Sequence, residues 1–312
     1  MKRGDLITIR DLSGEEILEI LDTAARIKRE PGRFGTALAG KTLAMIFEKP
    51  SLRTRVSFET GMTQLGGHAI NLGPAEISMG KRESVPDVAR ALSQMVDAIM
   101  ARTFSHQAII DLAQHASVPV INGLSDHLHP CQALADFMTI REALGRVDGI
   151  RLAYVGDGNN VAHSLMYTAA CLGAHVHVAA PEGYDPDPGV VREATKDAKR
   201  SGGSITTGRD IHAAVRGAQV VYTDTWASMG QESEHDSRVK AFRDFQVNAS
   251  LMKEAADGAI FMHCLPAHRG EEVTDEVLES SASVVFQQAG NRLHAQKAIL
   301  VRLIGVSSAA PS

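Results

Sequence analysis

Apolar residues along this chain cluster in segments typical of strands and helices that follow one another. Short runs of consecutive apolar residues, bounded by turn residues, predict strands buried on both faces of a parallel sheet. These predicted strands are Thr42–Phe47, Ala98–Arg102, Pro119–Leu124, Arg151–Gly156, His175–Ala180, Gln219–Thr223, Ala259–Leu265 and Ser283–Phe286. Between them, apolar positions recur with the period of an amphipathic helix. The predicted helices include Val56–Leu65, Pro86–Val96, Gln107–Ala116, His129–Leu144, Val161–Leu172, Asp187–Arg200, Ser237–Phe245 and Asn291–Ile304.

The repeated strand–helix order predicts an α/β protein with two doubly wound domains, each with a central parallel sheet flanked by helices. The pattern restarts after the long helix His129–Leu144, where the sequence Gly145-Arg146-Val147-Asp148-Gly149 supplies stop and linker signals. We therefore expect a first domain over residues 1–145 and a second over residues 146–290. We expect the last helix, residues 291–304, to pack back on the first domain.

Composition limits the kinds of protein that this chain can be. Its 312 residues allow two domains with full cores, and 44% apolar and 22% charged residues are typical of a soluble globular protein. A net charge of −5 argues against nucleic-acid binding. The three cysteines, Cys131, Cys171 and Cys264, do not make a disulfide framework and favour a reducing compartment. Because neither a signal-peptide pattern nor a membrane-spanning stretch is found, we expect a cytoplasmic protein that binds no membrane.

The segment Ser51-Leu52-Arg53-Thr54-Arg55 follows a predicted strand and opens a predicted helix. The first N–H groups of a helix lack partners within it, and the helix dipole is positive there, so this position suits an anion. The hydroxyl groups of Ser51 and Thr54 can donate hydrogen bonds, and each arginine can place two donors on a phosphate. The alternative explanation is a helix N-cap at Ser51 beside two solvated arginines.

Other polar residues also lie at predicted strand ends, where doubly wound folds bind their ligands. The first domain contributes a cation, an imidazole and an amide, namely Arg102, His129 and Gln132. The second contributes amides, carboxylates and a thiol, namely Asp157, Asn159, Asn160, His163, Asp224, His263 and Cys264. This division predicts an anionic substrate on the first domain and a cationic or zwitterionic one on the second. Each residue also has an ordinary structural explanation: Arg102 can reach solvent, His129 can cap a helix, and Cys264 can be an inert core thiol.

Several common cofactor sites are not indicated. The segment Gly156-Asp157-Gly158-Asn159-Asn160-Val161 resembles a dinucleotide fingerprint but lacks its third glycine, and the next strand ends without the acidic residue that binds a ribose. We therefore expect no nicotinamide or flavin cofactor. The sequence has no P-loop pattern, and its thirteen histidines show no His-Glu-x-x-His spacing. We expect neither a cofactor nor a dedicated metal site.

Over essentially its whole length the chain resembles the aspartate/ornithine carbamoyltransferase family. The segment Phe47–Arg55 is similar to that family's carbamoyl-phosphate loop, and His129–Asp136 is similar to its His-Pro-x-Gln-x-Leu-x-Asp helix start. The segment Asp224–Gly230 resembles the Ser-Met-Gly loop of the ornithine branch. His263-Cys264-Leu265-Pro266 and Asn291-Arg292 complete the set. Five spaced motifs in the right order are far more specific than any one of them.

Three positions depart from the family's pattern. Leu52 replaces the usual threonine, and we expect it to contribute mainly its backbone N–H, so the missing hydroxyl has a small effect. Ser78 stands where many relatives carry a glutamine that reaches the carbamoyl phosphate of the neighbouring subunit, and the shorter side chain puts that contact in doubt. Gly290 replaces a glutamate that commonly precedes Asn-Arg, with no evident effect on the chemistry.

The resemblance implies that the ornithine side-chain amine attacks carbamoyl phosphate, giving citrulline and phosphate. It also implies a homotrimer and a role in arginine biosynthesis, although these residues do not distinguish the biosynthetic from the catabolic direction. The catalytic residues that it implies are His129, Cys264, Arg53 and Arg102. The carbamoyl-phosphate contacts that it implies are Ser51, Leu52, Arg53, Thr54, Ser78, Arg102, His129, Pro130, Cys131, Gln132, Cys264, Leu265 and Arg292. The ornithine contacts that it implies are Asn160, Asp224, Ser228 and Met229. The substrates imply domain closure, with the Ser-Met-Gly loop as the moving lid.

Other functions stay open at this point. A sister enzyme could act on aspartate, an acylated ornithine or putrescine, although Asp224 and the Ser-Met-Gly loop favour a free amino acid with a basic side chain. A non-catalytic homologue would be expected to have lost Arg53, His129 or Cys264, and all three are present. The broken glycine pattern argues against an oxidoreductase. The acceptor of the amine proton is also open: the leaving phosphate is one candidate and a Cys264 thiolate is another.

Overall fold

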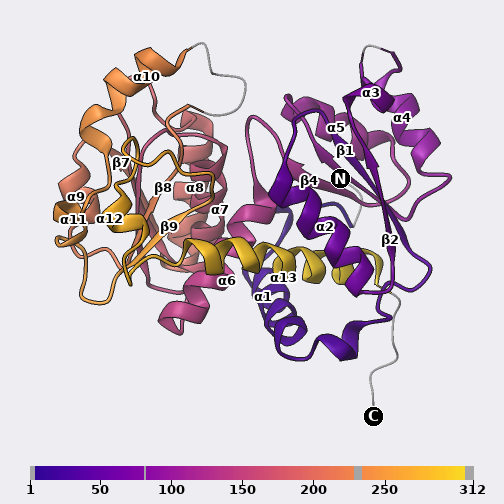
Figure 1. The fold of residues 1–312 in the computed structure, drawn as a ribbon, viewed down its shortest axis with the longest axis horizontal. Helices are drawn as coiled ribbons and strands as arrows, with labels where there is room; N and C mark the ends of the chain where they lie inside the picture. The colour runs from indigo at the N-terminus through magenta and orange to yellow at the C-terminus, as the bar shows by residue number, and fades with distance from the viewer. Residues whose placement is uncertain (1–3, 81, 228–233, 306–312) are drawn as a thin grey trace. The chain divides into compact units, whose positions relative to one another are not determined.

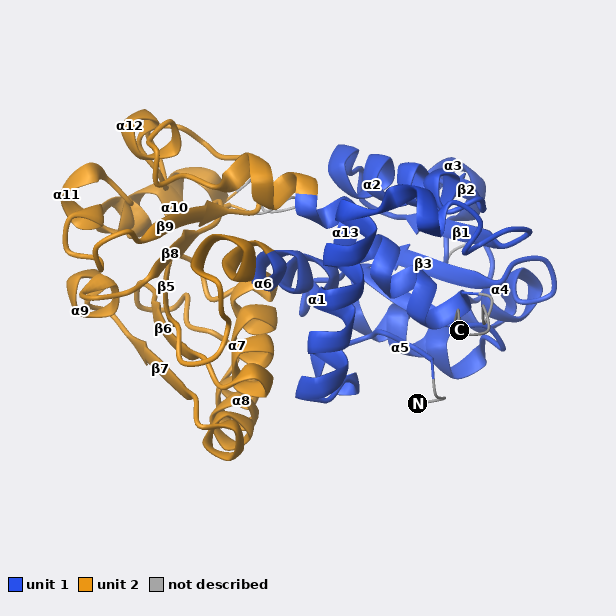
Figure 2. Cartoon of the chain, turned by 90° about the horizontal axis from the view of Figure 1, so that it is seen from below, with its two compact units in different colours: residues 1–138, 291–312 blue, residues 139–290 orange. Residues whose placement is uncertain are grey.

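The computed structural model describes residues 4–80, 82–227 and 234–305 (Figure 1). The chain divides into two compact units, coloured in Figure 2. Unit 1 comprises residues 1–138 and 291–312, and unit 2 comprises residues 139–290. Both divisions of the chain fall inside helices, the first in α6 (Pro130–Leu144) and the second in α13 (Val285–Ile304).

Unit 1 is built on a parallel sheet with the strand order β2-β1-β3-β4. Its strands are β1 (Thr42–Phe47), β2 (His68–Leu72), β3 (Ala98–Arg102) and β4 (Val120–Leu124). Its other helices are η1 (Ile9–Asp11), α1 (Gly14–Arg29), η2 (Pro31–Phe34), α2 (Leu52–Gln64), α3 (Pro74–Ile77), α4 (Val85–Leu92) and α5 (His106–His115). Every residue of β3 is buried, as is typical of a central parallel strand with both faces covered. On one face, Ala44 and Ile99 pack in a single apolar cluster with Val88 of α4 and Leu112 of α5.

Unit 2 is built on a second parallel sheet with the order β7-β6-β5-β8-β9. Its strands are β5 (Arg151–Val155), β6 (His175–Ala179), β7 (Ser204–Gly208), β8 (Val220–Thr223) and β9 (Ile260–His263). Its other helices are α7 (Asn160–Leu172), α8 (Pro188–Ser201), α9 (Ile211–Val215), α10 (His235–Phe242), η4 (Arg243–Phe245), α11 (Ala249–Met252) and α12 (Asp275–Leu278). Figure 2 shows α7 and α8 on one side of this sheet and α9 and α11 on the other. The predicted class, two doubly wound α/β units with parallel sheets, is confirmed.

The predicted strand Ser283–Phe286 is wrong, because α13 begins at Val285. The apolar run at these positions favoured a strand, but only Ser283 forms an isolated parallel bridge, to Phe261. The N–H of Gln288 then bonds to the carbonyl of Val284, which starts the helix. Helix α4 is also shorter than predicted and ends at Leu92, where the Ser93 hydroxyl donates to a carbonyl of the last turn.

Two strands and one long helix are among the elements that escaped prediction. Strands β2 and β7 lie at sheet edges, and their residues are only partly buried, so neither shows an apolar run. The long helix α1 was not among the predicted helices, although Ser13 and Glu16 form a capping box at its start. Within the described ranges, no helix combines the length and apolarity needed to cross a membrane.

In each sheet the direction of winding reverses between two neighbouring strands. The reversal lies between β1 and β3 in unit 1, and between β5 and β8 in unit 2. Doubly wound folds bind ligands at this point, beyond the carboxyl ends of the two strands, because the following loops leave in opposite directions and open a crevice. The segments after β1, β3, β5 and β8 are therefore the places to examine for a site.

Gly158 lies in the incomplete fingerprint after β5. Only glycine fits at this position, because the backbone of residues 184–186 passes close to it. Its N–H donates to the carbonyl of Tyr184, and a Cβ atom at this position would overlap Asp185 C and Pro186 N. The chain at residues 184–186 thus fills the space beside the glycine that a dinucleotide-binding loop leaves for a pyrophosphate.

We predict that Gly158→Ala lowers the stability of the protein by about 1–3 kcal/mol, because the added methyl group meets backbone that cannot rotate away. Gly290→Ala is the matched control, since Gly290 lies in α13 with open space around its Cβ position. There alanine should be neutral or stabilise by up to about 1 kcal/mol. Thermal unfolding followed by circular dichroism measures both changes. Equal unfolding temperatures for the two variants would contradict the prediction.

Candidate active site

The anion-binding candidate in unit 1 lies at the start of α2, directly after β1. Ser51 is the N-cap of this helix, and its Oγ accepts a hydrogen bond from the Thr54 N–H at 3.4 Å. Thr54 is fully buried, whereas Leu52 is exposed. Arg55 turns along the outside of the helix and pairs with Glu59 at 2.9 Å. Capping by Ser51 and an anion site at the helix start are compatible, because the cap uses only one N–H of the first turn.

Helix α13 contributes a second arginine to this place. Arg292 is buried, and its Nη2 donates to the Oγ1 of Thr54 at 2.7 Å. The adjacent Asn291 has a different partner, since its Oδ1 accepts from the Nζ of Lys28 in α1 at 2.8 Å. The two residues of the Asn-Arg motif therefore have separate contacts: Asn291 bonds to α1, and Arg292 bonds to the start of α2.

Arg102 and His129 reach the same place because of strand register. Phe47 at the end of β1 is paired with Arg102 at the end of β3, so the segment after β1 begins beside this arginine. His129 follows β4, the other neighbour of β3, and is 4% exposed. Burial, with help from the positive charges of Arg292 and Arg102, holds the pKa of His129 well below its usual value. This imidazole is therefore neutral at pH 7.

The first turn of α6 holds two further candidates with different properties. Cys131 is fully buried and its Sγ donates to the Asn122 carbonyl at 3.4 Å; burial raises the pKa of this thiol to about 12. Cys131 is thus an inert core thiol. Gln132 donates through Nε2 to Asp136 at 2.8 Å, while its buried Oε1 has no hydrogen-bond partner among the described residues. Pro130 is the first residue of the helix.

Ser78, which the sequence places among the carbamoyl-phosphate contacts, ends the short helix α3. Its Oγ donates to the Pro74 carbonyl of the same turn at 2.9 Å. The hydroxyl is thus engaged within its own helix.

The second group of candidates lies at the carboxyl ends of β5, β8 and β9 in unit 2. Asp224 follows β8, and its Oδ1 accepts from the Thr225 N–H at 2.8 Å and from the Cys264 Sγ at 2.9 Å. Its Oδ2 accepts from the Nδ2 of Asn159 at 2.8 Å. Asn159 is the N-cap of α7 and accepts from two N–H groups of the first turn, which leaves Asn160 as the first helical residue. Asp224 therefore links the three strand ends.

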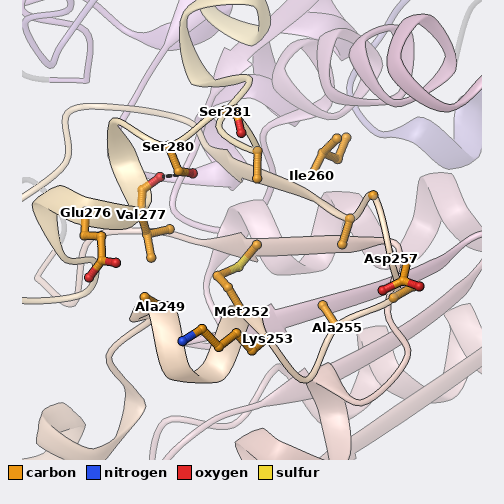
Figure 3. Close-up of a pocket in the computed structure, with 14 residues that line it drawn as sticks. Ala249, Met252, Lys253, Ala255, Asp257, Ile260, Glu276, Val277, Ser280 and Ser281 are labelled. Atoms are coloured by element: carbon orange, nitrogen blue, oxygen red, sulfur yellow. Dashed lines mark hydrogen bonds between the residues drawn. The ribbon is translucent and has the colours of Figure 1, made fainter.

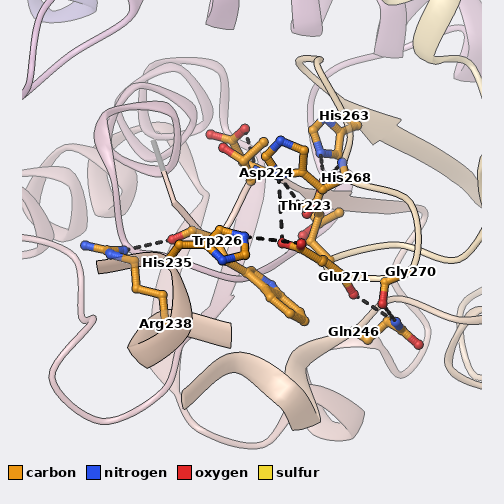
Figure 4. Close-up of polar contacts among 12 residues, drawn as sticks. Thr223, Asp224, Trp226, His235, Arg238, Gln246, His263, His268, Gly270 and Glu271 are labelled. Carbon is orange, nitrogen blue, oxygen red and sulfur yellow. Dashed lines mark hydrogen bonds and ion pairs between the residues drawn. The ribbon is translucent and has the colours of Figure 1, made fainter. Parts of the chain in front are cut away.

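Asp157, also after β5, forms a buried ion pair that sequence reasoning missed. Arg238 of α10 donates through Nη1 to Asp157 at 2.9 Å. The same Nη1 donates to the Trp226 carbonyl at 2.9 Å (Figure 4). Burial raises the pKa of Asp157 to about 6, and Arg238 opposes that rise. No motif in the sequence marked Arg238, because it lies inside a helix and not at a strand end.

Trp226 lies two residues beyond Asp224 and is 3% exposed. Its ring stacks on Phe242 of α10, with ring centroids 5.8 Å apart. Ser228 and Met229, predicted as ornithine contacts, lie outside the described residues.

The end of β9 holds Cys264 between two constrained neighbours. Leu265 has a left-handed backbone, with φ of 60°, and precedes a cis peptide bond to Pro266. The Leu265 N–H donates to Nδ1 of His263 at 2.9 Å, and Nε2 of His263 donates to Glu272 at 3.0 Å. His263 is therefore a neutral imidazole with its proton on Nε2. Asp224, His263 and Cys264 have possible ligand atoms within 4.8 Å of one another, but both nitrogens of His263 are already engaged, which disfavours metal binding there.

An open pocket of about 570 Å³ lies elsewhere in unit 2 (Figure 3). It is lined by Met252 and Lys253 at the end of α11, by Ile260 at the amino end of β9, and by Val277 and Ser280 near α12. Because it opens at the amino end of β9, it lies away from the strand ends that carry Asp224 and Cys264. We do not assign the chemistry of the candidate site to this pocket.

Comparison with known proteins gives a consistent result over the whole chain. A family model described as the carbamoyl-P binding domain of aspartate/ornithine carbamoyltransferase matches residues 4–142. The model of the Asp/Orn binding domain of the same family matches residues 148–303. The chain is 54% identical over 306 residues to an ornithine carbamoyltransferase of Anoxybacillus flavithermus, covering 97% of this chain and 98% of that protein.

Two comparisons concern Pyrococcus furiosus. The chain is 56% identical over 303 residues to its ornithine carbamoyltransferase described as anabolic, covering 96% of each protein. The solved structure of ornithine carbamoyltransferase from this organism superposes with a TM-score of 0.94, covering 96% of this chain and 97% of that one.

The buried, neutral His129 predicts a specific loss of stability in acid. Its pKa in the folded chain is depressed, so below about pH 6.5 the unfolded chain binds a proton that the folded chain does not. Stability is then complete above this pH and falls by up to about 1.4 kcal/mol per pH unit below it. A His129→Asn variant should lose this contribution. Unfolding temperatures of both proteins at pH 7.5 and 5.5 measure it, and an equal drop in both would contradict the prediction.

Proposed function

The chain belongs to the aspartate/ornithine carbamoyltransferase family, and we propose that it transfers the carbamoyl group of carbamoyl phosphate to the side-chain amine of L-ornithine, giving L-citrulline and phosphate. The observation that carries this proposal is the group of Arg102, Arg292 and neutral His129 around the start of α2. The domain models and named relatives support the choice of substrates. We assign carbamoyl phosphate to unit 1 and ornithine to unit 2.

The phosphate binds at the start of α2 in this proposal. The N–H groups of the first turn, including that of Leu52, and the positive end of the helix dipole favour an anion. Arg53 is the second residue of the same helix, and Arg292 is held there through Thr54. Leu52 needs no hydroxyl for this role, because its backbone N–H is the contributing group.

Arg102, His129 and Gln132 are assigned to the carbamoyl group. An arginine and a neutral imidazole can both donate to the carbamoyl oxygen, which gains negative charge as the amine attacks, and stabilising such charge often supplies most of an enzyme's rate enhancement. The buried Oε1 of Gln132 is an acceptor without a partner among the described residues, so it suits the carbamoyl NH₂. Pro130 and Cys131 then contribute through backbone and packing, since the Cys131 thiol is buried and protonated.

Asp224 is assigned to the α-ammonium group of ornithine. Three donors fix its carboxylate at the carboxyl end of β8, where it presents negative charge to a cationic group. Asn160, Ser228 and Met229 complete the proposed contacts with the amino-acid end. Asn159 becomes a positioning residue, because its side chain holds both Asp224 and the first turn of α7.

The attacking amine has to lose a proton. With a pKa near 10.4, its deprotonation at pH 7 costs roughly 4–5 kcal/mol in water. The Cys264 thiol donates its proton in a hydrogen bond to the Asp224 carboxylate, so it is present as a donor and not as a base. This contact supports the leaving phosphate as the proton acceptor. We assign Cys264 and Leu265 to the lining of the space around the reacting groups.

We further propose that the enzyme is a cytoplasmic homotrimer that acts in arginine biosynthesis without a cofactor. A relative from Pyrococcus furiosus described as anabolic supports the biosynthetic direction. The Ser78 hydroxyl is engaged with its own helix, which supports a reduced role for this residue toward a neighbouring subunit.

Citrulline formation tests the proposed activity. Purified protein with carbamoyl phosphate should form a carbamoylated product from L-ornithine, with kcat/KM well above that for acetylornithine, putrescine or aspartate supplied in the same way. Preferential use of another amine would assign the chain to a sister activity, and no product from any amine would indicate a non-catalytic homologue.

The two arginines of the α2 loop should differ sharply in importance. Arg53→Ala should lower kcat/KM by about 10²–10³-fold, because it removes a charged donor from the developing transition state. Arg55→Ala should change it less than about threefold, since Arg55 is exposed and pairs with Glu59. Steady-state kinetics with both substrates varied would measure both effects. Similar losses in the two variants would remove Arg53 from its proposed role.

A further inference from the structure

A second group of metal-binding side chains lies in unit 2, on the turn that follows β9. Possible ligand atoms of His268, Glu271 and Glu272 all lie within 4.8 Å of one another. Nδ1 of His268 is 3.9 Å from Oε2 of Glu271 and 3.9 Å from Oε2 of Glu272. His235, the first residue of α10, places its Nε2 3.3 Å from Oε1 of Glu271 (Figure 4). Two imidazoles and two carboxylates thus come together from two separate segments.

Glu272 is the feature of this group that points to a ligand. Its side chain is fully buried, and its Oε1 accepts from the Nε2 of His263 at 3.0 Å and from the His268 N–H at 2.6 Å. Its Oε2 is also buried but has no hydrogen-bond partner among the described residues. His263 brings no positive charge, because its Nδ1 accepts from the Leu265 N–H and it is therefore neutral.

A buried carboxylate oxygen without a hydrogen-bond partner is stabilised by a nearby cation. Removing an ionised group from water is unfavourable unless an opposite charge or hydrogen bonds compensate it. The oxygen faces the imidazole of His268, whose side chain is 44% exposed and therefore has room to adjust. The carboxylate of Glu271, 30% exposed, lies beside the same imidazole. The group therefore has one fixed oxygen inside and three adjustable donors nearer the solvent.

The spacing and the donor types fit a transition-metal ion. In a tetrahedral zinc site, nitrogen and oxygen ligands lie about 2.0–2.2 Å from the metal, which places them about 3.3–3.6 Å from one another. The separations of 3.9 Å between His268 and each glutamate need only small side-chain rotations to reach this range. His235 lies 3.3 Å from Glu271 and has to turn further to join the other two ligands. Mixed imidazole and carboxylate donors suit Zn²⁺, whereas Mg²⁺ and Ca²⁺ prefer oxygen ligands throughout.

We propose that Glu272, Glu271 and His268, with His235 as the fourth ligand, bind one divalent transition-metal ion of the zinc class. The ion neutralises the buried carboxylate and ties the first residue of α10 to the turn after β9. Through Glu272 it also fixes His263, which precedes Cys264, so the ion acts as a structural support beside the proposed ornithine contacts. The proposal uses no residue assigned to either substrate.

The metal alone is the probe in the experiment that tests this proposal. The full-length protein is freed of metal with a chelator and titrated with Zn²⁺ by isothermal calorimetry. We expect one ion per chain and a rise in unfolding temperature of a few degrees at saturation. His268→Ala and Glu271→Gln, both changes of partly exposed side chains, should each weaken binding at least tenfold. His212→Ala is the matched control, because His212 forms a similar pair with Glu254 elsewhere in unit 2.

Co²⁺ separates this site from the Cys264 thiol. Bound by imidazole and carboxylate ligands, Co²⁺ gives only weak visible bands, whereas a thiolate ligand adds an intense charge-transfer band in the near ultraviolet. Visible bands that disappear in His268→Ala, without the thiolate band, support the proposal. The proposal is overturned if the wild-type protein binds no Zn²⁺, if His268→Ala and Glu271→Gln bind it as tightly as His212→Ala does, or if the Co²⁺ spectrum is that of a thiolate site.

Discussion

Each unit carries one candidate half-site, meaning the site residues at the carboxyl ends of its own strands. Both half-sites depend on the parallel hydrogen-bond ladder between the two strands at which the winding reverses. In unit 1 it pairs Phe47 with Arg102, and in unit 2 it pairs Val155 with Thr223. Each pairing brings two loops to one edge of the sheet, although about fifty residues or more separate them in the sequence. A shift of register by one residue would turn the Arg102 side chain to the opposite face of the sheet. The positions of the reactive side chains in each half-site are thus set by backbone hydrogen bonds that take no part in the reaction.

Burial gives the two half-sites opposite electrostatic characters. In unit 1, desolvation and two arginines keep His129 neutral. The positive charge there is carried by the arginines, which stay protonated at any ordinary pH. In unit 2, Asp224 is held by an amide, a backbone N–H and a thiol, none of which carries a positive charge. The neighbouring Asp157 is the one that receives the arginine, Arg238. One carboxylate is therefore compensated inside the unit, and the other remains able to attract a cationic ligand.

The sequence predicted what depends on local pattern and missed what depends on tertiary contact. The central strands appeared as apolar runs because both their faces are covered, whereas β2 and β7 are edge strands with partly exposed residues and gave no such signal. Ser283–Phe286 looked like a strand because it contains a short apolar run, and the start of α13 overrode that pattern. Strand-end positions identified Ser51, Arg102 and Asp224 as candidates. The pairing of Asp157 with Arg238 had no local signal, because α10 meets β5 only in the folded chain.

The position of Trp226 has a practical consequence for observing this protein. It is the only tryptophan in the sequence, it is buried against Phe242, and it lies two residues from Asp224. Intrinsic fluorescence excited at the red edge of the protein's absorption therefore comes from a single place in unit 2. The chain carries a built-in optical label at the proposed ornithine half-site and none at the start of α2. Events in one half can thus be followed in the unmodified protein without interference from the other.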